Sequence, residues 1–62
     1  MHIEFRHGPK DGERRFLPFG KVSDTIIVEL GDIEYLYKAT HRRTRDNICV
    51  IYQCLGILST AA

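Results

Sequence analysis

The sequence predicts an all-β protein, a five-stranded antiparallel meander that forms either an open sheet or a small SH3-like barrel. Apolar residues alternate with polar residues along most of the 62-residue chain, which is the period of a half-buried strand. Short segments rich in glycine, proline and aspartate separate these runs, as turns do. No helix-start signal precedes a pattern with a period of 3.6 residues.

Residues 2–6 and 13–17 are expected to form an N-terminal hairpin. In the first strand Ile3 and Phe5 alternate with polar neighbours. Residues 8–12, Gly-Pro-Lys-Asp-Gly, have the composition of a tight turn. Pro18 has no N–H to donate, so the second strand should end there or lie at an edge of the sheet.

Three further strands are expected after a turn at residues 19–24. They cover residues 25–30, 33–41 and 48–55, with reversals at residues 31–32 and 42–47. The last strand is apolar on both faces, so it should be central or covered on both sides. We therefore expect one small β-domain over residues 1–56, followed by a C-terminal tail at residues 57–62.

The composition is that of an ordinary globular domain. Hydrophobic residues make up 44% of the chain and the formal net charge is +1, which excludes a charge-driven disordered chain. The N-terminus lacks the apolar core of a signal peptide. The apolar run at residues 48–58 is shorter than the ~20 residues of a membrane helix. A cytoplasmic protein without membrane contact is expected.

Two cysteines, Cys49 and Cys54, lie in the last predicted strand. Five residues of strand separate their Cα atoms by ~17 Å, too far for an intrachain disulfide. Their odd spacing places them on opposite faces of the strand. Two free thiols in a reducing compartment are expected.

The sequence offers little for catalysis or for metal binding. His41 could face Cys49 across the last hairpin, but a buried cysteine in that position is usually structural, and so small a sheet hardly encloses a substrate pocket. The histidines and cysteines lack the spacings that place two ligands on one ion, and no glycine-rich phosphate loop is present. No enzymatic activity, metal or cofactor is expected.

The basic turn is the feature that most favours a binding function. Four cations and one acid, Asp46, fall within nine residues, and Tyr35 and Tyr37 lie on the strand that leads into this turn. The cations are Lys38, Arg42, Arg43 and Arg45. Basic residues beside exposed aromatic residues are typical of single-stranded nucleic-acid binding. The favoured interpretation, however, is a solvated hairpin turn whose tyrosines are core residues.

The whole-chain pI of about 7.8 is lower than that of a dedicated nucleic-acid domain. The leading expectation is therefore a non-enzymatic interaction or structural module with an unknown protein partner. Nucleic-acid binding through residues 38–46 is the alternative. Residues 22–37 carry four acids and no Lys or Arg, a pattern that suits ion pairs with the basic turn, within one chain or between two.

Self-association is expected because the last strand needs cover on two faces and the chain offers no amphipathic helix. The residues expected at a homodimer interface are Cys49, Ile51 and Leu55. A two-fold dimer is the commonest way to bury such a face. Alternatively, Ile57 and Leu58 could fold back and cover it within one chain.

The N-terminal hairpin resembles a group of short uncharacterised bacterial and phage-encoded β-proteins. These proteins open with an apolar strand, then Gly-Gly-Pro-x-Asp-Gly and a second strand, and close with an aromatic hairpin. Residues 3–12 and 35–52 correspond to these two features, with His7 in place of the first glycine. The resemblance implies a small β-domain of phage or mobile-element origin and carries over no catalytic residue.

Overall fold

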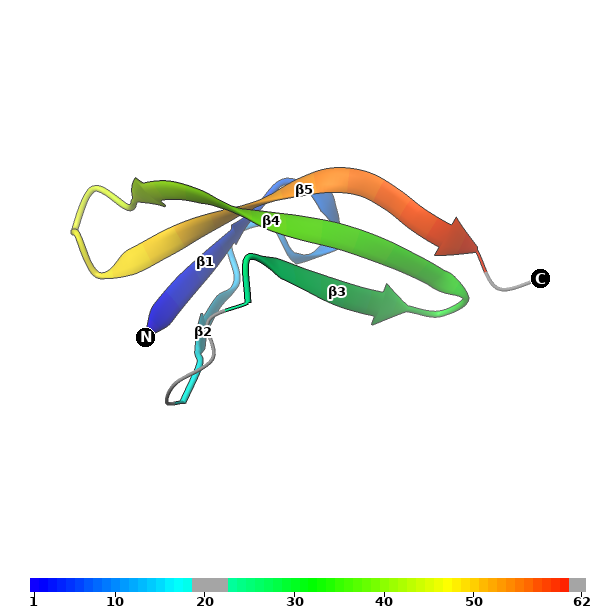
Figure 1. Cartoon of the computed structure of the whole chain (residues 1–62), viewed down its shortest axis with the longest axis horizontal. Helices are drawn as coiled ribbons and strands as arrows, with labels where there is room; N and C mark the ends of the chain where they lie inside the picture. The colour runs from blue at the N-terminus through cyan, green and yellow to red at the C-terminus, as the bar shows by residue number, and fades with distance from the viewer. Residues whose placement is uncertain (19–22, 61–62) are drawn as a thin grey trace.

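The computed structural model describes residues 1–18 and 23–60 and shows five strands in one open sheet (Figure 1). The strands are β1 (His2–Arg6), β2 (Arg14–Phe16), β3 (Thr25–Leu30), β4 (Ile33–Arg43) and β5 (Cys49–Thr60). A short 3₁₀ turn, η1 (Gly8–Lys10), follows β1. The prediction of a small all-β protein is confirmed.

The strand order corrects the predicted meander. The order is β2-β1-β5-β4-β3, in which β5 pairs antiparallel with β4 and parallel with β1. The sheet is therefore mixed, and it is open rather than a closed barrel, with β2 and β3 at its edges. In a meander β5 would be an edge strand, but a strand that is apolar on both faces is better accommodated between two neighbours.

The connection from β2 to β3 carries the chain from one edge of the sheet to the other. It begins where Met1 and Leu17 exchange two hydrogen bonds, of 2.8 and 2.7 Å. It ends where the Ala39 N–H donates to the Asp24 carbonyl at 2.8 Å. Residues 19–22, which belong to the turn expected at residues 19–24, and residues 61–62 lie outside the described residues.

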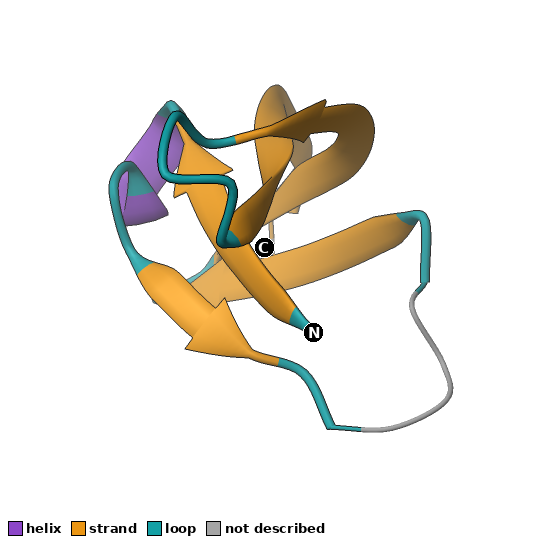
Figure 2. Cartoon of the chain, turned by 90° about the vertical axis from the view of Figure 1, so that its left-hand side faces the viewer, coloured by secondary structure: helices purple, strands orange, loops and turns teal. Residues whose placement is uncertain are grey.

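The hydrophobic core lies on one face of the sheet. It comprises Ile3, Phe5, Val28, Tyr37 and Tyr52. These residues come from β1, β3, β4 and β5, so strands that are not neighbours reach one cluster because the sheet is strongly twisted (Figure 2). Phe5 and Tyr37 pack edge to face, with ring centroids 4.7 Å apart.

The turn after β1 is fixed to the sheet through Tyr37. The Tyr37 hydroxyl donates to the His7 carbonyl at 2.6 Å and accepts from the Lys10 N–H at 3.1 Å. Gly8 has a φ of +66°, and a Cβ there would lie 2.5 Å from the Tyr37 hydroxyl and 2.7 Å from the Cys54 sulfur. Only glycine fits at this position, for reasons of both conformation and space.

β5 extends five residues beyond its expected end at residue 55. Residues 57–60, expected in the C-terminal tail, pair with β4 instead: Ile57 is opposite Tyr35, and Thr60 is opposite Ile33. Two register shifts near Leu36 and Tyr35 bend this part of the ladder. Strand β5 therefore takes in residues 57–60 of the expected tail.

Both cysteines are free, as predicted. Cys49 is fully buried, and Cys54 is half-buried against the core cluster. Strand alternation places Cys49 on the opposite face, because Val50 and Tyr52 share the core face with Cys54.

In the part of the chain that the structure describes, no helix has the length and apolar character needed to cross a membrane.

Candidate anion-binding site

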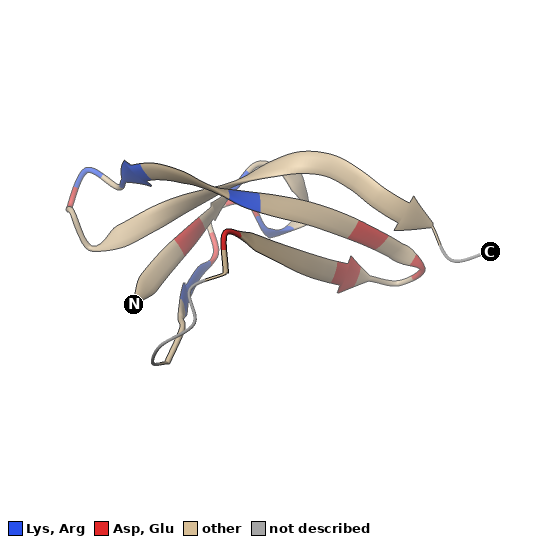
Figure 3. Ribbon diagram, in the orientation of Figure 1, with Lys and Arg blue, Asp and Glu red and all other residues tan. Residues whose placement is uncertain are grey.

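The acids around the β3–β4 turn and the arginines of the β4–β5 turn lie at opposite ends of the molecule (Figure 3). Basic residues lie in the N-terminal hairpin and at the β4–β5 turn, whereas Glu29, Asp32 and Glu34 lie around the β3–β4 turn. Within residues 1–18 and 23–60, the ion pairs join Glu4, Glu13 and Asp46 to cations of the N-terminal hairpin. The acidic segment thus makes no ion pair with the basic turn among these residues, contrary to the expected pairing within one chain.

An open cavity of about 480 Å³ lies beside the β4–β5 turn. The side chains that line it are predominantly arginines, from three parts of the chain: Arg6 on β1, Arg14 on β2, and Arg42, Arg43 and Arg45 around the turn. Thr44, Asp46 and Ile51 complete the lining. This face of the sheet is the one opposite the hydrophobic core, because Arg6 and Ile51 alternate with the core residues Phe5 and Tyr52.

Glu4 holds two of these arginines in place. Its carboxylate accepts from Arg6 Nε at 2.6 Å and from Arg14 Nε at 2.9 Å, and the residue is only 8% exposed. These two guanidinium groups lower the pKa of Glu4, so the carboxylate stays ionised beneath them. Glu4 and Asp46 in turn raise the pKa of Arg14 above its already high value.

Asp46 anchors the turn on the same side of the cavity. Its carboxylate accepts from the Thr44 hydroxyl, from the Ile48 N–H at 3.1 Å and from Arg14 at 2.8 Å. The Thr44 and Ile48 hydrogen bonds, together with Arg14, lower the pKa of Asp46 to about 2. Thr44 also accepts from the Cys49 N–H at 3.1 Å, which ties the turn to the start of β5.

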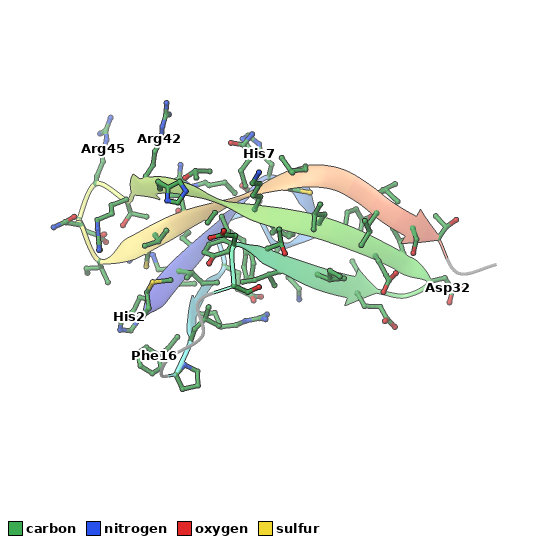
Figure 4. All side chains as sticks on the ribbon, in the orientation of Figure 1. His2, His7, Phe16, Asp32, Arg42 and Arg45 are labelled. Carbon is green, nitrogen blue, oxygen red and sulfur yellow. The ribbon has the colours of Figure 1, made fainter. Side chains whose placement is uncertain are left out.

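The three arginines of the turn remain available to a ligand. Arg42, Arg43 and Arg45 are exposed, and no carboxylate of residues 1–18 or 23–60 forms an ion pair with them. Figure 4 shows Arg42 and Arg45 extending away from the sheet. The cavity therefore carries five guanidinium groups against the two carboxylates of Glu4 and Asp46, in a protein whose net charge is +1. Such a surface suits a ligand with several anionic groups.

Some of the predicted binding residues line this cavity, and others do not. The arginines of the turn come together as expected, whereas Lys38 is exposed but does not line the cavity. Tyr37 is fully buried, and Tyr35 is half-buried against the core. Tyr37 therefore cannot stack on a ligand, and the possibility that the tyrosines are core residues is the one that the packing supports.

Arg6 and Arg14 are the residues that the sequence analysis missed. Arg6 lies on the polar face of the first predicted strand, and Arg14 lies in a charged segment that any hairpin could carry. Only the parallel pairing of β1 with β5 brings them to the β4–β5 turn. Sequence periodicity places a side chain on a face, but it does not give the order of the strands.

The residues expected at a dimer interface do not form one exposed surface. Cys49 is fully buried within the single chain. Its N–H donates to the Thr44 hydroxyl, and it pairs with His2 of β1. Ile51 is half-buried and lines the arginine cavity. Leu55 alone is well exposed. On this face of β5, Cys49 and Ile51 are thus fully and partly buried within one chain, whereas Leu55 is not.

The structure does not place His41 beside Cys49, and in the β1–β5 ladder Cys49 lies opposite His2 instead. His41 lines a separate cavity of about 270 Å³ with Asp24 and Tyr52, and Cys49 does not line that cavity. Among residues 1–18 and 23–60, no three His, Cys, Asp or Glu side chains are close enough to hold a metal ion. The arginines remain protonated near neutral pH, so they can bind and orient anions.

No protein-family model, curated protein or solved structure matches this chain. The fold and the site together define a small all-β domain with an arginine-lined face.

Proposed function

We propose that this chain is a non-catalytic binding module whose ligand is the phosphate backbone of a nucleic acid. The observation that supports this proposal is the convergence of five arginines on one cavity, three of them without a carboxylate partner in the described residues. Guanidinium groups bind phosphate through paired N–H donors, and a row of them matches a polyanion better than a single anion. A neutral protein partner would leave these charges desolvated and unpaired.

The low net charge of the chain is compatible with this proposal because the charges are separated in space. Glu29, Asp32 and Glu34 lie at the far end of the molecule, so they do not offset the positive charge of the turn arginines (Figure 3). About three phosphate contacts, one for each arginine of the turn, would give moderate affinity and strong salt dependence.

Fluorescence anisotropy with a labelled oligonucleotide tests the proposal. For about three phosphate contacts on a single strand, affinity should fall about 20-fold between 50 and 200 mM salt. Arg42→Gln and Arg45→Gln should each weaken binding about tenfold, because each removes a charge-assisted hydrogen bond. Lys10→Gln, which removes the same charge from the turn after β1, should change affinity little.

Absence of binding at 50 mM salt would contradict the proposal. Equal losses for Lys10→Gln and the two arginine variants would also contradict it, because they would indicate a response to net charge rather than to this cavity.

A further inference from the structure

An exposed pair of aromatic rings lies on the same face as the arginine cavity. Phe16 is the last residue of β2 and is 58% exposed. The next residue, Leu17, packs against the core. The Phe16 ring lies beside the His2 imidazole, with centroids 4.9 Å apart and planes tilted by 57°. Single exposed apolar residues are common on protein surfaces. A paired, exposed aromatic surface next to a cationic site is a more specific arrangement.

The strand register fixes the position of this pair relative to the cavity. His2 is opposite Phe16 in the β1–β2 ladder, and Glu4 is opposite Arg14 two residues further along. Residues two apart on a strand share a face, about 6.6 Å from each other. On the face that the arginines line, the His2–Phe16 pair is therefore the neighbour of the Glu4–Arg14 ion pair along the β1–β2 ladder.

The pair and the turn arginines lie at the same end of the molecule but on different strands. Figure 4 shows His2 and Phe16 on one border of this end, and Arg42 and Arg45 on the other. Between β2 and β4 lie β1 and β5, so three strand spacings, or about 14 Å, separate the two borders. An extended ligand that crosses the sheet would meet aromatic rings first and guanidinium groups next.

Two hydrogen bonds keep Phe16 in this exposed position. Met1 and Leu17 bond to each other through their backbone groups, which fixes the end of β2 immediately after Phe16. On β2, Arg15 takes the core-side position, with its guanidinium 5.2 Å from the centre of the Phe5 ring. Because neighbouring strand residues alternate, Phe16 must then face away from the core.

We infer that the ligand is a single-stranded nucleic acid, with a base stacked on Phe16 and His2 and with its phosphates on the arginines. This inference rests on the proposed function. In a duplex the base faces are already stacked on each other, whereas an unpaired base offers its face to an aromatic side chain. The structure thus supplies at Phe16 the stacking surface that the buried Tyr37 cannot supply.

The experiment compares two labelled probes of equal length, an oligothymidine and an oligomer with abasic sugars on the same phosphodiester backbone. The full chain should bind oligothymidine more tightly than the abasic probe and more tightly than a duplex. Phe16→Ala should weaken oligothymidine binding about 5- to 150-fold, the range for one stacked base, and leave abasic binding unchanged. Phe16→Trp should retain oligothymidine binding. Ile48→Ala, at a comparably exposed apolar residue of the turn, is the matched control.

The two probes separate failure of the inference from failure of the proposed function. If Phe16→Ala leaves oligothymidine binding intact while Arg42→Gln weakens both probes, stacking at Phe16 is wrong and phosphate binding stands. Equal losses on both probes for Phe16→Ala, or tighter binding of the duplex, would also overturn the inference. If the unaltered chain binds neither probe, the proposed function fails, and the inference fails with it.

Discussion

His7 has a backbone conformation that residues other than glycine rarely adopt. Its φ is 65° and its ψ is 175°, a region populated almost only by glycine. The turn requires this conformation because the His7 N–H donates to the Asp11 carboxylate at 2.6 Å and its carbonyl accepts from Tyr37. The Gly-Gly-Pro-x-Asp-Gly pattern that this segment resembles has glycine here, and glycine adopts this conformation without strain.

His7→Gly should therefore stabilise the protein. Relief of strain is worth about 1–3 kcal/mol, and the extra freedom of glycine in the unfolded chain costs about 0.5–1 kcal/mol. A net gain of about 1 kcal/mol would raise Tm by about 4–8 °C in a domain of this size. Thermal denaturation followed by circular dichroism measures it. His2→Gly, within β1, should lower Tm instead, and a lower Tm for His7→Gly would contradict the assignment of strain.

At the scale of single elements, the β4–β5 turn depends on the ionised carboxylate of Asp46. The Thr44 hydroxyl, the Ile48 N–H and Arg14 all bind the charged form, which lowers the pKa of Asp46 to about 2. The turn that displays the arginines is therefore held by a group with a lowered pKa. Such a group stabilises the folded state above its unfolded pKa of about 3.9, and this contribution is lost as pH falls through the folded value.

Asp46→Asn should lower Tm at pH 7, and its deficit relative to the unaltered chain should shrink between about pH 4 and pH 2. The comparison isolates Asp46 because both proteins retain Glu4 and Glu13, whose pKa values are also lowered by neighbouring cations. Thermal melts at several pH values measure the difference. A deficit that stays constant down to pH 2 would show that the carboxylate charge does not hold the turn.

The acidic end of the molecule exposes large apolar side chains on both faces of the sheet. Five of its large apolar side chains there are about half exposed or more: Ile27, Leu30, Leu55, Ile57 and Leu58. They belong to β3 and to the distal part of β5, and β3 is an edge strand of the sheet. Edge strands with apolar side chains readily pair with another chain. We propose that self-association uses this end, with Leu55 as the one member of the expected interface that takes part, and does not use Cys49 or Ile51.

Ile57→Gln should then weaken dimerisation at least about tenfold, because each copy loses a buried aliphatic side chain. Ile48→Gln, which alters an exposed isoleucine at the opposite end, should leave dimerisation unchanged. Sedimentation velocity across a range of concentrations measures the equilibrium. A species of 7.2 kDa that persists at high micromolar concentration would refute self-association.

The sequence determined the local structure of this protein. Alternation at Ile3 and Phe5, the Asp11-Gly12 turn and Pro18 predicted the first hairpin, and the same reasoning located β3 and β4. These features depend on contacts between residues close in the chain. The arginines of the basic turn could be predicted for the same reason, because they are neighbours in sequence.

Only the tertiary structure decided which elements lie side by side. The sequence indicated that β5 is apolar on both faces, and hence central, but a meander would have left it at an edge. Placing β1 parallel to β5 resolves that conflict, and the same pairing brings Arg6 and Arg14 to the basic turn. Likewise, burial of Tyr37 follows from its contacts with Phe5 and His7, which are 30 or more residues away in the chain. The face of each side chain is a local property of the strand, whereas its neighbours are set by long-range packing of the whole chain.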